Sequence, residues 1–165
     1  MKILYYFVAI FLLLVFQQGV LVPLRIMPVN LLLVFSVAAM LVADFDTALG
    51  VAVTCGVLLD LTSGTPDGVI ALSLLSAVLI LHFILESWVS REANQPVLFS
   101  AAAGTTVAYF LLFLIFNRFF TIFNLGQDLQ LSDYFLRALP LSLLFNLIFT
   151  YPVFLFFSYV QSIRS

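Results

Sequence analysis

Long apolar runs separated by short polar segments dominate this chain. A helix needs about 20 apolar residues to cross the hydrocarbon core of a bilayer. Six runs are candidates for such helices, and residues that favour turns separate them. The predicted helices are residues 3–22, 29–43, 47–61, 69–88, 97–117 and 138–160. The pattern therefore predicts an all-α polytopic integral membrane protein, with six transmembrane helices in a single domain over residues 1–165.

The composition excludes a soluble domain. Hydrophobic residues make up 64% and charged residues 8% of the chain, against about 45–50% and about 25% in soluble proteins. The net charge of −2 provides neither a basic patch for nucleic acid nor a polybasic segment for anionic lipid headgroups. We therefore expect membrane lipid around the chain and no nucleic-acid partner. Cys55 is the single cysteine, so no internal disulfide forms, and we interpret it as a packing residue.

The second and third predicted helices are short for membrane spans. About 15 residues give about 22 Å of helix, less than the roughly 30 Å of the hydrocarbon core. They span the bilayer if flanking residues extend them or if the bilayer thins locally; a re-entrant hairpin would leave four spans. One continuous helix is rejected, because it would put Asp44 and Asp46 in mid-membrane. Both termini are thus expected on one side, and the three-to-three division of Lys and Arg leaves the orientation undecided.

The densest group of polar residues ends the third predicted helix, over residues 56–68. Asp60 lies within the apolar run, where a carboxylate must be neutralised, paired or hydrogen-bonded. Gly64, Pro66 and Gly68 then fold the chain sharply. We favour a structural interpretation, in which Asp60 binds the backbone of this turn as a helix cap does. The alternative is a site for a cation, a proton or a substrate.

A stripe of small residues lies upstream, at Ala48, Ala52 and Gly56. Small residues at every fourth position let a second helix approach closely within a membrane. The stripe is predicted to pack against a helix of this chain or against another protein. A second small cluster over residues 100–106 opens the fifth helix and suits the same purpose.

Few other polar side chains require an explanation. His82 and Glu86 share one helix face and suggest an ionic cluster at the membrane interface, near the polar turn 44–46. Asn146 is interpreted as a hydrogen-bonding group between helices, and Pro152 as the site of a kink. No nucleophile, metal set or phosphate-binding loop accompanies them. We therefore expect no enzymatic activity, no metal and no cofactor.

The longest connection, residues 118–137, alternates aromatic or aliphatic residues with polar ones. This suits a segment in the membrane interface with its apolar side toward the lipid. Its candidate residues are Arg118, Phe123, Tyr134 and Arg137. The alternative is a surface on which a partner docks.

The stretch 50–72 resembles the signature region of the rod shape-determining protein MreD family. The family pattern is a glycine, several apolar residues, Asp-Leu, a Gly-x-Pro-x-Gly turn and Ala-Leu. The matching residues are Gly56, Asp60, Gly64, Pro66, Gly68, Ala71 and Leu72. The length of the chain, its six apolar segments and the residues 28–33 that open the second helix are also similar to that family.

The resemblance implies a non-enzymatic adaptor of the bacterial cell-wall elongation complex, which controls cell shape from the cytoplasmic (inner) membrane. The implied partner is an MreC-like protein, bound within the membrane and at its periplasmic face. The indirect partners are an MreB-like actin homologue, a RodA-like glycosyltransferase and a class B penicillin-binding protein. The resemblance also implies cytoplasmic termini, and thus a periplasmic position for the turn after Asp60 and for residues 118–137.

Members of this family are similar in fold to the substrate-binding subunits of energy-coupling-factor vitamin transporters, so such a subunit is the alternative function. Those subunits usually carry an Ala-xxx-Ala stripe in the first helix, which docks on the transporter. Here Ala9 is the only alanine of that helix. This difference favours the adaptor.

Overall fold

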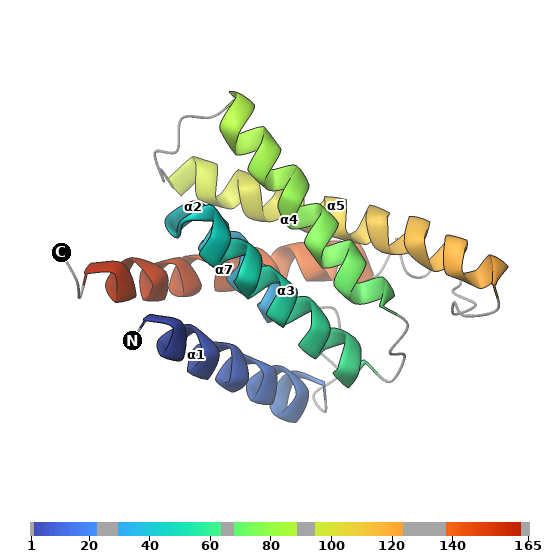
Figure 1. Cartoon of the computed structure of the whole chain (residues 1–165), viewed down its shortest axis with the longest axis horizontal. Helices are drawn as coiled ribbons and strands as arrows, with labels where there is room; N and C mark the ends of the chain where they lie inside the picture. The colour runs from blue at the N-terminus through green and yellow to red at the C-terminus, as the bar shows by residue number, and fades with distance from the viewer. Residues whose placement is uncertain (1, 23–29, 64–67, 89–94, 124–137, 163–165) are drawn as a thin grey trace.

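The computed structural model describes residues 2–22, 30–63, 68–88, 95–123 and 138–162. All regular structure in these ranges is helical, and the helices pack side by side and cross one another (Figure 1). The elements are α1 (Lys2–Phe16), the π-helix η1 (Gln17–Leu21), α2 (Leu31–Val42), α3 (Phe45–Thr62), α4 (Val69–Trp88), α5 (Gln95–Ile122) and α7 (Leu139–Ser162). The predicted all-α class is confirmed for the described residues.

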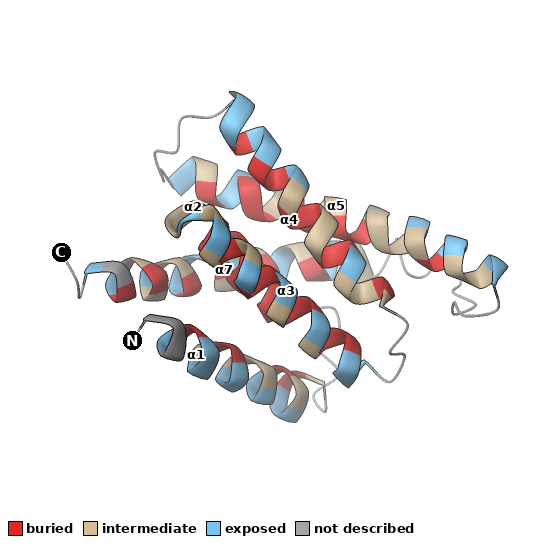
Figure 2. Ribbon diagram, in the orientation of Figure 1, coloured by how far each residue is buried: buried red, intermediate tan, exposed pale blue. Residues whose placement is uncertain are grey.

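Four helices among the described residues, α3, α4, α5 and α7, are long and apolar enough to cross a membrane. Exposed positions follow the outward faces of these helices (Figure 2), and many of the exposed residues are large and apolar. Phe83, Ile115 and Tyr159, for example, are 64%, 61% and 67% exposed. An exposed apolar surface of this extent is unfavourable in water and is solvated by acyl chains in a bilayer. The chain is therefore a multi-pass membrane protein.

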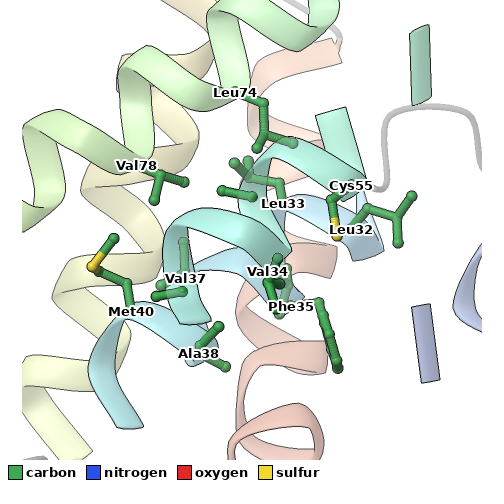
Figure 3. Close-up of a cluster of buried hydrophobic side chains, with 14 of the residues drawn as sticks. Leu32, Leu33, Val34, Phe35, Val37, Ala38, Met40, Cys55, Leu74 and Val78 are labelled. Carbon is green, nitrogen blue, oxygen red and sulfur yellow. The ribbon is translucent and has the colours of Figure 1, made fainter. Parts of the chain in front are cut away.

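Helix α2 lies at the centre of the bundle. Its residues 31–40 are all buried, and it contacts α1, α3, α4, α5 and α7. Figure 3 shows its side chains among Cys55 of α3 and Leu74 and Val78 of α4. A helix that is apolar on every side is typical of a buried core element.

The second predicted helix, 29–43, is thus shorter in the structure than expected. The 12 residues of α2 give about 18 Å of helix, which is less than the roughly 30 Å of a hydrocarbon core. The helix ends early at its C-terminus because the extended Ala43 leads directly into the cap of the next helix.

Helix α3 begins two residues earlier than the predicted range 47–61. Asp44 is its N-cap, and the carboxylate Oδ2 accepts hydrogen bonds from the backbone N–H of Thr47 at 3.1 Å and from its hydroxyl at 2.9 Å. The negative charge of Asp46 in the first turn is also favourable at a helix N-terminus. Flanking residues therefore lengthen this helix to 18 residues. Extension by flanking residues was one of the two predicted ways for this helix to span the bilayer.

Side chains from other helices bind the N-terminus of α2. Asn146 of α7 accepts a hydrogen bond from the backbone N–H of Asn30 at 3.1 Å, and Gln17 of η1 accepts one from Leu31 at 2.9 Å. The Asn30 side chain itself caps the helix by accepting from Leu33 at 2.9 Å. Asn146 also donates to Thr106 of α5 at 3.2 Å. The predicted role of Asn146 as a hydrogen-bonding group between helices is confirmed. Pro152, for which a kink is predicted, lies within α7.

The small-residue stripe packs inside this chain. Ala48 and Ala52 are 0% exposed, and a Cβ on Gly56 would lie 3.1 Å from the backbone Cα of Ala71 in α4. The stripe therefore provides a close contact between helices of one chain. Of the two predicted roles, the burial of these residues among the described helices favours packing against a helix of this chain.

Gly56→Leu is expected to destabilise the fold by about 1–3 kcal/mol, because its side chain would collide with the backbone at Ala71. Gly50→Leu is the matched control, since an added Cβ at Gly50 meets nothing within 4 Å. Unfolding in detergent can be followed with a thiol-reactive dye, because Cys55 is 0% exposed. Equal unfolding temperatures of the two variants would contradict the contact.

Asn146→Leu is expected to lower the free energy of unfolding by about 1–3 kcal/mol, because it leaves the backbone N–H of Asn30 without an acceptor. Ser142→Ala serves as the control, since it removes only a 3.3 Å bond from the Asn146 amide. Thermal unfolding in the same dye assay separates the two variants. A larger loss of stability in Ser142→Ala would show that the α2 terminus does not depend on Asn146.

Candidate functional site

The described residues of the segment 50–72 that carry the resemblance lie at and around the junction of α3 and α4. Asp60 stands in the last turns of α3 and is 8% exposed. Gly68 immediately precedes α4. Gly64 and Pro66 lie outside the described residues. The junction is therefore described from the two helix ends and from the contacts between them.

The Asp60 carboxylate caps α4 from the neighbouring helix. Its Oδ2 accepts a hydrogen bond from the Gly68 N–H at 2.7 Å, and its Oδ1 accepts one from the Ile70 N–H at 3.2 Å. The first N–H groups of a helix have no partner within that helix, and a carboxylate there also interacts favourably with the helix dipole. Both carboxylate oxygens thus have backbone partners. This geometry agrees with the structural interpretation of Asp60.

Gly68 makes this long-range cap possible. Its φ of +78° lies in the left-handed region, which glycine adopts without steric cost. Its carbonyl accepts the hydrogen bond of the Leu72 N–H at 2.9 Å, so α4 is hydrogen-bonded from this residue onward. A glycine has no side chain with which to cap its own helix. Asp60 supplies that group instead.

Gly56 sets the spacing between the two helices. It lies one helical turn before Asp60, and Ala71 lies in the first turn of α4. The close approach of Gly56 to Ala71 brings the start of α4 within reach of the Asp60 carboxylate. Gly56, Asp60, Gly68 and Ala71 therefore act as one unit, which we call the α3–α4 clasp.

The hydroxyl groups near Asp60 bind carbonyl groups at the end of α3. Thr62 donates to the carbonyl of Leu58 at 2.9 Å, and Ser63 donates to the carbonyl of Asp60 at 2.8 Å. Gln18 of η1 donates to the Thr62 hydroxyl at 3.1 Å. These hydrogen bonds stabilise the C-terminal end of α3.

Sequence reasoning missed the roles of Gln17 and Gln18. Gln17 is buried and binds the start of α2, while Gln18 reaches the end of α3. The signal was available, because two consecutive carboxamides in an apolar membrane segment need hydrogen-bond partners. The sequence alone did not indicate which helix ends supply those partners.

His82 and Glu86 lie as predicted on one face of α4, with His82 Nε2 and Glu86 Oε2 3.5 Å apart. The His82 ring stacks on Phe45 at a centroid distance of 4.2 Å, which places it beside the start of α3. Within the described ranges, no group of three His, Cys, Asp or Glu side chains is arranged to hold a metal ion. The expectation of no cofactor stays a prediction.

The predicted interfacial segment is described only at its start. The fifth helix does not end at residue 117, because α5 continues to Ile122 and carries Arg118 on its exposed surface. Phe123 follows it and is 61% exposed. The 28 residues of α5 give about 42 Å of helix, which exceeds the hydrocarbon core and lets one end reach the interface. Tyr134 and Arg137 lie outside the described residues.

Comparison with known proteins adds no relative to this description. No family model, no curated protein and no solved structure matches the chain.

Asp60→Ala is expected to destabilise the protein by about 1–2 kcal/mol, because two N–H groups at the start of α4 lose their acceptor. Asp60→Asn retains one carbonyl acceptor and is expected to lose roughly half as much. Thermal unfolding measures both effects, and hydrogen exchange at Gly68 and Ile70 localises them.

Asp46→Asn is the control, because it removes a carboxylate from the first turn of α3 and leaves the Asp60 cap of α4 in place. If Asp60→Asn abolished binding of a partner or an ion while the Gly68 and Ile70 amides stayed protected, the functional interpretation of Asp60 would replace the structural one.

Proposed function

We propose that this protein is a member of the MreD family and acts as a non-enzymatic adaptor in the bacterial cytoplasmic membrane. In this proposal it belongs to the cell-wall elongation complex and binds an MreC-like protein within the membrane and at its periplasmic face. Through that protein it is connected to an MreB-like actin homologue, a RodA-like glycosyltransferase and a class B penicillin-binding protein.

The α3–α4 clasp is the observation that supports the proposal most. The residues that match the family pattern are brought together in space by contacts that depend on their identity. Gly56 permits close approach, Asp60 caps α4, and Gly68 adopts a positive φ. The spacing of the pattern thus has a physical reason in this chain. This reason supports the resemblance more than the short sequence match does by itself.

The proposal includes six membrane crossings, cytoplasmic termini and a fold similar to the substrate-binding subunits of energy-coupling-factor transporters. Two observations support the crossings beyond the four long helices. Helix α1 continues into η1, so this helical segment runs from Lys2 to Leu21. Polar residues flank the short α2, with Asn30 before it and Asp44 after it. Local thinning of the bilayer lets such a short helix cross.

Three polar groups of the interior favour an adaptor, because their hydrogen-bonding capacity is used by the fold itself. Asp60, Gln17 and Asn146 all accept hydrogen bonds from helix N-termini. The outward helix faces are apolar and are suited to lateral contact with another membrane helix. Such contacts are individually weak, at about 1 kcal/mol or less each, so several must act together.

Depletion of this protein from its bacterium is expected to turn rod-shaped cells into spheres, because the elongation complex would lose its membrane adaptor. An MreC-like protein should co-purify with the tagged wild-type chain in mild detergent. The Gly50→Leu variant is the control, because a substitution that the fold tolerates should leave this co-purification unchanged. A vitamin retained through purification, together with binding to a transporter ATPase, would replace the adaptor by the transporter subunit.

A further inference from the structure

The first helical segment changes its winding between α1 and the loop that follows. Helix α1 lies at the edge of the bundle (Figure 1), and the π-helix η1 continues it over Gln17–Leu21. In η1 the backbone N–H of Val22 donates to the carbonyl of Gln17, five residues earlier, at 3.0 Å. A turn of this kind holds one residue more than an α-helical turn. Single π-turns are rare and often occur at functional positions, so the contacts of η1 require an explanation.

The two glutamines that open η1 bind two different helices. Gln17 Oε1 accepts from the Leu31 N–H at the start of α2, and Gln18 Nε2 donates to the Thr62 hydroxyl near the end of α3. The two distances are 2.9 Å and 3.1 Å. Thr62 lies two residues after Asp60, whose carboxylate caps α4. The end of α1 is therefore hydrogen-bonded to α2 and, through α3, to the α3–α4 clasp.

Leu21 holds the other end of η1 in place. Its side chain is 6% exposed and packs against Leu31. The wide turn lies between the two glutamines and Leu21. If this turn rewound into α-helix, the side chains on its two sides would rotate relative to each other by about one residue, or about 100°. The glutamines could not then stay on their partners while Leu21 stayed on Leu31.

We propose that η1 is a coupling element, in which the hydrogen bonds of Gln17 and Gln18 are made and lost together. The inference goes beyond the adaptor function and does not depend on the identity of a partner. Both glutamines precede the wide turn, so they move as one piece with the end of α1. A displacement of α1 therefore reaches Leu31 of α2 and Thr62 of α3 at the same time.

The alternative is that the two hydrogen bonds are independent. Each would then stabilise only the helix end that it touches, and loss of the Gln18 bond would leave the start of α2 unchanged. In a coupled element, the Gln18 bond helps to keep η1 in its π-winding, which is uncommon in helices. Its loss then also affects the Leu31 N–H, which is bound by Gln17.

Gln18→Leu and Thr62→Val each remove the hydrogen bond between η1 and α3. Each is expected to speed hydrogen exchange of the Leu31 amide in lipid nanodiscs by about threefold to tenfold, because η1 rewinds more often and withdraws Gln17. Thr54→Val is the matched control. The Thr54 hydroxyl also bonds back within α3, and its removal leaves the Gln18 bond in place, so exchange at Leu31 should equal that of the wild type.

The Ala48 amide distinguishes coupling from a general loss of stability. It donates to the Asp44 carbonyl at the opposite end of α3. Faster exchange at Leu31 with unchanged exchange at Ala48 supports the proposal. Unchanged exchange at Leu31, or an equal increase at both amides, would overturn it. Protection of Cys55, which is 0% exposed, from thiol reagents shows that each variant is folded.

Deletion of Gly19 tests the winding itself. Gly19 is exposed, and an added Cβ there meets nothing within 4 Å, so the deletion removes one residue from the wide turn without removing a side-chain contact. We expect exchange at Leu31 to rise as much as in Gln17→Leu, whereas Gly19→Ala, which keeps the number of residues, leaves it unchanged. Slow exchange at Leu31 in the deletion variant would show that the π-winding does not position the glutamines, and would overturn the proposal.

Discussion

Hydrocarbon cannot solvate a backbone N–H, and this constraint governs the interior of the molecule. The starts of α2 and α4 both have N–H groups that no residue of their own helix accepts. Each is bound by side chains from a different helix: Gln17 and Asn146 serve α2, and Asp60 serves α4. Gln17, Asp60 and Asn146, all buried, therefore hold the bundle together at helix ends, where the membrane offers no substitute.

This use of polar residues connects the fold with the proposed function. Because Gln17, Asp60 and Asn146 are bound within the bundle, the exterior of the described helices consists mainly of apolar surface, including the small-residue face of α5. A protein of this design influences its surroundings through the shape of its lateral surface. The α3–α4 clasp ties α4 to α3 on one side of that surface, where Asp60 binds the start of α4 and Gly56 lies close to Ala71.

Periodicity and polarity placed the six apolar runs, and each of them contains a helix among the described residues, because apolar runs and turn residues are local properties. The early end of α2 was not predictable in the same way, since it depends on the cap of the next helix. Asp60 was recognised as a group that needs partners, yet its partners Gly68 and Ile70 belong to the next helix. The small residues near Gly56 and near Gly104 look alike in the sequence. Only packing shows that the first stripe is covered and the second is open.

The bond between Asn30 and Asn146 joins residues that are 116 positions apart. When α2 leaves the ribosome, the acceptor for its first N–H has not yet been synthesised. The hydrogen bond that joins the start of α2 to α7 therefore cannot form until translation reaches α7. Until then the cell's insertion machinery, or the hydrated surface of the bilayer, has to supply that missing acceptor. A polypeptide released before α7 therefore lacks the Asn146 acceptor for the Asn30 N–H.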